Sequence, residues 1–283
     1  MNCARPPQLS RRARTPRRRS DEILEAYERR SKLFAELHRH PPFILPSAWD
    51  VTSARAMVAS GAAAVASSNG GHLDALLLGG KAAYRERAID LVARIVNQVD
   101  VPVAADLETA FGDDLDEVVT TTTSLICAGA VGINLEDSGA SSDSWPGPPL
   151  YTPAEQSRRI AAARSAAEQA GVTLFVNARI DVFLLSVGEP RGRLDDVITR
   201  AATYTHAGAD GIFVPALLDL AALRAIADAT ALPINVAAVP GAPPVVDLVA
   251  AGVTRFTPGS ERARALLAHA QSDPGRGGGQ RDG

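Results

Sequence analysis

The sequence predicts an α/β fold, a single (β/α)8 barrel of the TIM type. Short apolar runs rich in β-branched residues alternate with Ala-rich amphipathic segments, the pattern of parallel strands joined by helical crossovers. Eight such runs occur in about 220 residues, whereas an open doubly wound sheet more often has five or six strands. With 283 residues, of which 46% are hydrophobic and 22% charged, the chain can build a core of this size.

Each predicted strand is a β-rich apolar stretch, and many of them end in polar residues. In chain order they are Phe43–Trp49, Ala63–Asn69, Val101–Glu108, Val131–Asp137, Leu174–Asp181, Gly211–Ala216, Ile234–Ala238 and Arg255–Ser260. Many of the helical segments before these strands end in a glycine, which suits the left-handed conformation of a helix C-cap. These glycines are Gly61, Gly129, Gly171, Gly208 and Gly252. Their recurrence supports the division into strand–helix units.

Both ends of the chain lie outside the predicted barrel domain, residues 21–270. Residues 1–20 carry seven Arg and no acid, and residues 271–283 include PGRGGGQRDG. Segments without enough apolar residues cannot form a core, so we predict a disordered basic leader and a disordered tail. A basic arm can also hold nucleic acid or an anionic surface, but this one lacks the aromatic side chains that stack on bases. No nucleic-acid partner is expected.

The composition also argues against a membrane protein and a disulfide framework. No stretch approaches the roughly 18 to 20 uninterrupted apolar residues that a membrane helix needs, so no membrane partner is expected. The two cysteines, Cys3 in a polar tail and Cys127 in an apolar run, suit a reducing compartment, and we expect a cytoplasmic protein. Cys127 lies near the end of the helix before the fourth strand, where we expect a small buried hydrophobic residue away from the catalytic loops.

Acidic side chains gather at the ends of the third and fourth strands, and TIM-barrel enzymes carry their chemistry at that end. Asp106 and Glu108 are two residues apart, so their side chains leave the same face of a strand, and Glu136 ends the neighbouring strand. Three carboxylates in a partly desolvated cleft repel one another unless a cation is present, and hard oxygen ligands select Mg²⁺ or Mn²⁺. The sequence therefore predicts a divalent metal site. Pairing with Lys or Arg at the rim is the alternative.

Arg179 is the candidate for capturing an anionic substrate. In VNARID it shares one strand face with Asn177 and Asp181, and a guanidinium at a barrel mouth suits bidentate capture of a carboxylate or phosphonate. A structural salt bridge to Glu136 or Asp181 is the alternative. Further candidates for substrate binding lie at other strands. They are Ser67, Ser68 and Asn69 on the second strand, in the Gly-rich SSNGGH that is either an anion cradle or simply a loop, Asn235 on the seventh, and Trp49 at the floor of the pocket.

Taken in order, six stretches resemble the isocitrate lyase and phosphoenolpyruvate mutase superfamily. They are LPSAWDVTSARAMVASGAAAVASS, VPVAADLETAFGDD, AGAVGINLEDS, VNARIDVFL, HAGADGIFVPAL and LPINVAAVPGAP, and they span nearly all of residues 43–260. The resemblance implies that Asp106, Glu108 and Glu136 bind a metal, partly through water, and that Arg179 meets the substrate carboxylate. It also implies that Ser68 and the amides after it grip the substrate. A homo-oligomer, a dimer or tetramer that exchanges the last helix around Glu261–Ala270, is implied as well.

The loop after the fourth strand departs from the family pattern. Family lyases carry a catalytic cysteine there in a Lys-Cys-Gly-His type motif, and the mutases carry a Lys followed closely by Asn-Ser. This loop reads SGASSDSWPGPPLYTP, which contains no Cys, Lys or His. We therefore expect a subgroup without the gating-loop cysteine, in which the fold and metal site carry over while the reaction does not.

These residues and the resemblance together suggest three functions. The leading hypothesis is a Mg²⁺-dependent lyase or decarboxylase that cleaves a C–C bond in a small 2-oxo or 2-hydroxy carboxylate, with the metal and Arg179 stabilising an enolate. Arg179, Glu136 and Asp106 are its catalytic residues. The second is a P–C bond enzyme similar to phosphonopyruvate hydrolase or phosphoenolpyruvate mutase. The third is a non-catalytic barrel that binds a metabolite.

Overall fold

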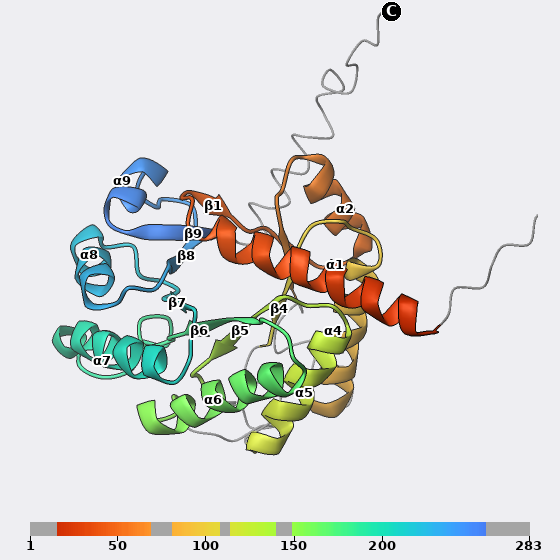
Figure 1. The fold of residues 1–283 in the computed structure, drawn as a ribbon. Coiled ribbons are helices and arrows are strands. Elements are labelled where there is room, and N and C mark those ends of the chain that lie inside the picture. The colour runs from red at the N-terminus through yellow and green to blue at the C-terminus, as the bar shows by residue number, and fades with distance from the viewer. Residues whose placement is uncertain (1–15, 69–80, 108–113, 140–148, 259–283) are drawn as a thin grey trace, which may run out of the picture.

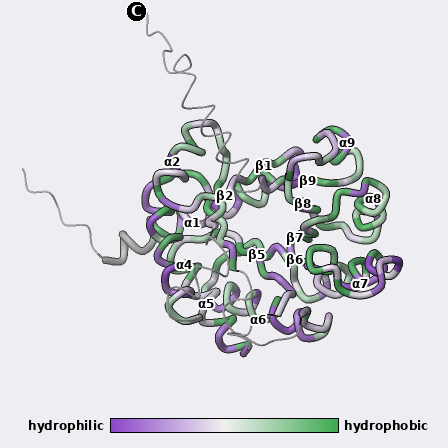
Figure 2. The backbone as a smooth tube through the Cα atoms, turned by 180° about the vertical axis from the view of Figure 1, so that it is seen from behind, coloured by the Kyte–Doolittle hydropathy of each residue, from purple (hydrophilic) through white to green (hydrophobic). Residues whose placement is uncertain are grey.

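The computed structural model describes residues 16–68, 81–107, 114–139 and 149–258 of the chain. Within these ranges, nine parallel strands form one curled sheet in the order β1-β9-β8-β7-β6-β5-β4-β3-β2, with helices around its outside (Figure 1). Seen from behind, the outer helices carry hydrophilic and hydrophobic residues along the same helix (Figure 2). This mixture is typical of amphipathic helices that cover a sheet. Among the described helices, none combines the length and apolar character needed to cross a membrane.

Strands and helices alternate along the chain as predicted. The strands are β1 (Phe43–Ile44), β2 (Ser47–Ala48), β3 (Val65–Ser67), β4 (Val103–Asp106), β5 (Gly132–Glu136), β6 (Phe175–Arg179), β7 (Gly211–Phe213), β8 (Ile234–Ala238) and β9 (Val253–Pro258). The helices are α1 (Pro16–Leu37), α2 (Val51–Ala59), α4 (Lys81–Val96), α5 (Leu115–Cys127), α6 (Pro153–Gln169), a short 3₁₀ helix (Pro190–Gly192), α7 (Arg193–His206), α8 (Leu220–Ala229) and α9 (Val245–Ala250). Every predicted strand run overlaps an observed strand, although β9 begins at Val253, two residues before the predicted start at Arg255.

The two ends of the strand order belong to one continuous segment, residues 43–48. Its first part, β1, pairs with β9, and its second part, β2, pairs with β3. The Leu45 N–H donates to the Phe256 carbonyl at 2.9 Å, and the Ala66 N–H donates to the Pro46 carbonyl at 2.8 Å. The segment changes partner at Pro46, which has no N–H with which to continue a ladder. The parallel, curled α/β sheet agrees with the predicted fold class, while the predicted exchange of the last helix lies outside the described residues.

The predicted helix ends are confirmed by the backbone. All five predicted C-cap glycines have a positive φ, between +67° and +99°, and each lies two residues after the last residue of its helix. A side chain would be strained in this conformation, which explains why glycine recurs at these points. The start of α2 is equally well specified, because the Asp50 carboxylate accepts the Ser53 N–H at 2.6 Å in a capping box.

Helix α1 covers the end of the sheet at which the strands begin. The buried ring of Phe34 lies edge-on to Phe43 and Phe175, with centroid separations of 5.9 and 5.6 Å. A Cβ at Gly132 would lie only 2.6 Å from Phe34 Cε1, so glycine permits this close approach of α1 to β5. The helix begins at Pro16, inside the segment predicted as a disordered leader. Proline suits the first turn of a helix, a local preference that overall composition does not reveal.

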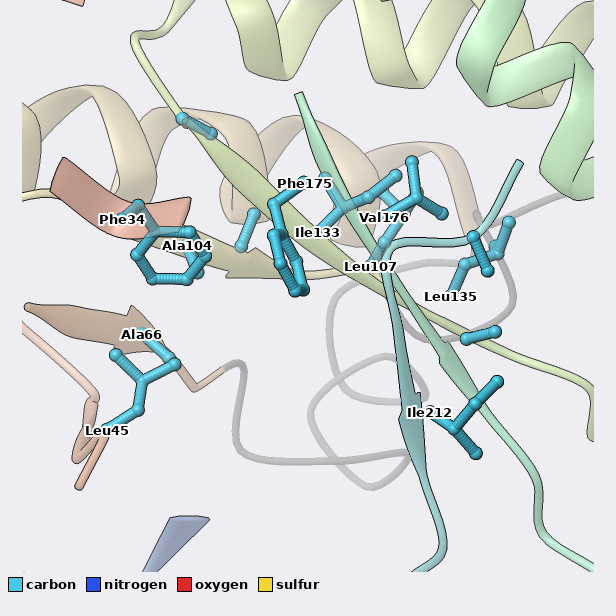
Figure 3. Packing of buried hydrophobic residues seen from close by; sticks show 14 of the residues in the cluster. Phe34, Leu45, Ala66, Ala104, Leu107, Ile133, Leu135, Phe175, Val176 and Ile212 are labelled. Atoms are coloured by element: carbon cyan, nitrogen blue, oxygen red, sulfur yellow. The ribbon is translucent and has the colours of Figure 1, made fainter. Parts of the chain in front are cut away.

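Alternation along β5 separates apolar from polar side chains. Ile133 and Leu135 belong to the buried apolar cluster (Figure 3). The intervening Asn134 points to the opposite face, where its Oδ1 accepts from Asn177 Nδ2 of β6 at 2.9 Å and from Arg255 Nη2 of β9 at 3.2 Å. Strands β5 and β9 are not neighbours in the sheet, so this polar face is the inside of the curled sheet.

Candidate active site

Charged side chains meet where β5 and β6 end. Glu136 and Arg179, the last residues of these strands, are paired in register. Arg179 Nη1 lies 2.7 Å from Glu136 Oε2, and Arg179 Nε lies 2.7 Å from Asp181 Oδ1. Both carboxylates are buried and the arginine is half-buried. The structure thus places Arg179 and Asp181 on one face, as predicted, and it contains both salt bridges that formed the alternative interpretation of Arg179.

Asp106 lies beside this group at the end of β4, in register with Asn134 of β5. Burial alone would lower the pKa of Arg179, but the negative charges of Glu136, Asp181 and Asp106 outweigh burial and raise that pKa. The guanidinium therefore stays charged at every physiological pH. A permanently charged group with five N–H donors is suited to holding an anionic substrate group.

Arg255 is a second cation inside the curled sheet, and the sequence analysis did not identify its importance. It is 1% exposed and donates to Asn134 as described above. Burial lowers its pKa to about 9, and the charge of Asp106 partly opposes that effect. The signal in the sequence was an arginine in a predicted strand that has no other charged residue, because a buried cation requires a nearby counter-charge.

The other predicted substrate-binding residues are near strand ends but have structural contacts. Ser67, which ends β3, accepts the Asp106 N–H at 3.3 Å, and the Ser68 N–H donates to the Ala48 carbonyl at 2.7 Å. The Trp49 N–H donates to Ser53 Oγ at 3.1 Å.

Asn235, the second residue of β8, is buried and in register with Phe213 at the end of β7. Its Oδ1 accepts from Thr257 Oγ1 at 3.2 Å, and its Nδ2 has no hydrogen-bond partner among the described residues. The predicted binding residue Asn69 lies outside the described residues. Substrate contact stays a prediction for all of these residues.

Two of the three predicted metal ligands, Asp106 and Glu136, end neighbouring strands. Glu108 lies outside the described residues, and the part of the chain that the structure describes has no group of three His, Cys, Asp or Glu side chains that could hold a metal. The donor chemistry nevertheless fits Mg²⁺, which is commonly bound by one or two carboxylates with waters completing its octahedron. Asp106 and Glu136 are oxygen donors of this type, and they would hold the ion.

Cys127 is exposed, which corrects the prediction that it is buried. It is the last residue of α5, where the sequence analysis placed it. However, it shares the exposed face of the helix with Thr120 and Thr123, whereas Leu125 and Ile126 are buried. The apolar neighbours in the sequence therefore belong to the other side of the helix.

A buried polar cluster, which was not predicted from the sequence, lies on the opposite face of the sheet from these ion pairs. Asp137 follows Glu136, so its side chain leaves the opposite face of the sheet, toward α7. Its carboxylate accepts from the Asp181 N–H at 2.9 Å, the Tyr204 hydroxyl at 2.8 Å and Arg200 Nη1 at 3.0 Å. Burial raises the pKa of Asp137 to about 6, although these contacts favour its charged form. Only the spacing of Arg200 and Tyr204, four residues apart, hinted at a shared helix face.

Comparison with known proteins identifies the family. The model described as phosphoenolpyruvate phosphomutase matches residues 34–273. An uncharacterized protein of Mycobacterium tuberculosis is 35% identical over 229 residues, covering 79% of this chain and 80% of that protein. The 2-methylisocitrate lyase of Escherichia coli is 32% identical over 50% of this chain and 46% of that enzyme. An oxaloacetate decarboxylase of Rhodopseudomonas palustris is 33% identical over 53% of this chain and 48% of that enzyme.

Solved structures agree with this result. A Burkholderia cenocepacia J2315 protein, provisionally described as a phosphonomutase, is 36% identical, with a TM-score of 0.75 over 87% of this chain and 97% of that chain. The matches include lyases, decarboxylases and mutases, so they define the family and the range of reactions within it. The chain belongs to the isocitrate lyase/phosphoenolpyruvate mutase superfamily.

Proposed function

We propose that the protein is a Mg²⁺- or Mn²⁺-dependent lyase or decarboxylase that cleaves a C–C bond in a small 2-oxo or 2-hydroxy carboxylate. The observation that carries the proposal is the position of Arg179. Its guanidinium is held by Glu136 and Asp181, each at 2.7 Å, where β5 and β6 end and beside Asp106. Active sites of barrels of this type lie at the carboxyl ends of the strands.

In this proposal Arg179 binds the substrate carboxylate, and Glu136 and Asp181 fix the direction of the guanidinium. Asp106, Glu136 and Glu108 would hold the metal, which would supply a Lewis acid for a substrate oxygen. Burial excludes water around these groups and strengthens each charge interaction. The remaining substrate contacts are assigned to Trp49, Ser67, Ser68, Asn69 and Asn235.

The similarity to a 2-methylisocitrate lyase and to an oxaloacetate decarboxylase supports C–C cleavage of a small carboxylate. The proposal also includes what the sequence indicates about the whole protein: a barrel domain bounded near residues 21 and 270, a cytoplasmic location, and a homo-oligomer. The loop SGASSDSWPGPPLYTP offers no Cys, so the proton donor differs from the thiol of the family's lyases.

A second candidate is P–C bond chemistry. The matching family model is described as phosphoenolpyruvate phosphomutase, and the Burkholderia structure with a TM-score of 0.75 is provisionally a phosphonomutase. Arg179 can hold the carboxylate of a phosphonate substrate as well as that of a 2-oxo acid. A barrel that binds a metabolite without catalysis is the third candidate.

A substrate panel distinguishes the three candidates. Purified protein with Mg²⁺ is incubated with 2-oxo and 2-hydroxy dicarboxylates and with phosphonopyruvate, and the products are identified by NMR. We expect metal-dependent C–C cleavage of at least one carboxylate, lost in Asp106→Ala. Turnover of phosphonopyruvate alone would support the second candidate, and ligand binding without any turnover would support the third.

A further inference from the structure

We propose that Asp137, Arg200 and Tyr204 form a positioning unit that fixes the direction of the Arg179 guanidinium. The inference rests on the proposed role of Arg179 and extends it to three side chains on the other face of the sheet. None of the three contacts substrate in this proposal. They act through Asp181, which is the link between the unit and the arginine.

The two oxygens of the Asp137 carboxylate have separate roles. Oδ1 accepts the backbone N–H of Asp181 at 2.9 Å, while Oδ2 accepts from Tyr204 and Arg200 at 2.8 and 3.0 Å. The backbone N–H of Asp137 also donates to the Arg179 carbonyl at 3.0 Å. Asp137 therefore forms hydrogen bonds with the main chain on both sides of the residue that lies between Arg179 and Asp181.

This hold determines where the Asp181 side chain can lie. Asp181 is 1% exposed, and its Oδ1 receives Arg179 Nε at 2.7 Å. A chain of contacts thus runs from α7 through Asp137 and Asp181 to the guanidinium. Hydrogen bonds that involve charged groups are shorter and stronger than neutral ones, so a displacement at one link is transmitted to the next.

The unit is itself anchored from two elements. Arg200 Nη1 also donates to the Tyr151 carbonyl at 2.8 Å, and Arg200 Nε lies 3.0 Å from Asp196 Oδ1 on the preceding turn of α7. The Tyr151 N–H donates to the Asp137 carbonyl at 2.8 Å. The connection before α6 and helix α7 therefore both hold the orientation of the Asp137 carboxylate.

The energetics favour a positioning role over a purely stabilising one. A buried ion pair gives little net stability, because desolvation of both charges offsets their attraction, and well-packed apolar residues often stabilise as much. Asp137 is completely buried and Arg200 is 7% exposed. In this proposal the buried polar contacts fix the direction of the Arg179 guanidinium, which apolar packing could not do.

The test measures the Arg179 guanidinium directly, without a ligand. In ¹⁵N-labelled full-length protein, the Arg179 Nε–H signal is assigned by its loss in Arg179→Lys, and its exchange with water is measured by NMR. We expect Tyr204→Phe and Asp137→Asn to accelerate this exchange by at least about fivefold, the scale of one lost hydrogen bond. Thr203→Ala is the matched control on α7, because among the described residues the Thr203 hydroxyl donates to the Thr199 carbonyl of its own helix and makes no hydrogen bond to Asp137, Arg200 or Tyr204. Unchanged exchange in both folded variants would overturn the inference.

A double-mutant cycle with oxalate and Mg²⁺ tests the consequence for binding. By calorimetry, Asp137→Asn should weaken oxalate binding about tenfold when Arg179 is present and less than twofold in the Arg179→Lys background. Equal losses in both backgrounds would contradict action through Arg179. If the wild-type protein bound neither oxalate nor any carboxylate of the substrate panel, the proposed function would fail, and the exchange measurement would still decide the inference.

Discussion

Replacing Arg179 with lysine preserves the charge but removes the planar fork of N–H groups. The guanidinium uses Nη1 for Glu136 and Nε for Asp181, both at 2.7 Å, and an ammonium group cannot reproduce both directions. A hydrogen bond to a charged group contributes about 1.5–3 kcal/mol. Loss of one such contact to the substrate carboxylate, about 2 kcal/mol, corresponds to a decrease in kcat/KM of about 30-fold. The melting temperature should also fall, because one buried carboxylate loses its partner.

Steady-state kinetics on a substrate from the panel measure the change in kcat/KM. The matched control is Arg164→Lys. Arg164 also pairs with a carboxylate, that of Asp210, and donates to the Leu174 carbonyl just before β6, at the opposite end of the strand from Arg179. Arg164→Lys should lower stability and leave kcat/KM nearly unchanged. If Arg179→Lys kept the kcat/KM of the wild type, Arg179 would be a structural ion-pair residue and the proposed substrate capture would be wrong.

Three further predictions concern the metal, the buried His38 that directly follows α1, and the exposed thiol of Cys127. Saturating Mg²⁺, at about 100 times Kd, should stabilise the folded protein by about 2.7 kcal/mol, and Asp106→Ala should abolish the corresponding rise in Tm measured by calorimetry; an equal rise in the variant would place the metal elsewhere. Burial lowers the pKa of His38 from 6.5 to about 3. Between these two pH values, the unfolded chain therefore binds a proton at His38 and the folded protein does not. Urea unfolding should therefore show stability falling as the pH drops below about 6.5, by up to about 1.4 kcal/mol per pH unit, and a His38→Phe variant with the same slope would refute this. Iodoacetamide should label the exposed Cys127 of the native protein without loss of turnover, and Cys127→Ser should keep kcat within about twofold and Tm unchanged; a 10³-fold loss in a folded variant would implicate a thiol acid.

The sequence was sufficient to predict the strand–helix order because local signals are strong in this chain. Each predicted strand run overlaps an observed strand, and the five C-cap glycines have the positive φ that their positions require. The alternation of side chains along the fifth predicted strand was enough to place Arg179 and Asp181 on one face. These predictions succeeded because they depend on residues close together in the chain.

Features that depend on contacts between distant segments could not be predicted in the same way. Arg255 meets Asn134 across the inside of the sheet, 121 positions apart in the sequence. Asp137 meets Arg200 and Tyr204 more than 60 positions away. The burial of Cys127 was predicted wrongly because a one-dimensional apolar run does not show which side of a helix faces the core. Such pairings are determined by tertiary packing, and the sequence alone contains no spacing rule for them.

The most direct test of the proposed function is a crystal structure with Mg²⁺ and oxalate bound. The account predicts a metal ion within reach of the Asp106 and Glu136 carboxylates, directly or through waters at the 2.0–2.1 Å metal–oxygen distance typical of Mg²⁺. It also predicts an oxalate carboxylate on the Arg179 guanidinium. An ion and an oxalate bound away from these residues, with Arg179 still held only by Glu136 and Asp181, would contradict the account.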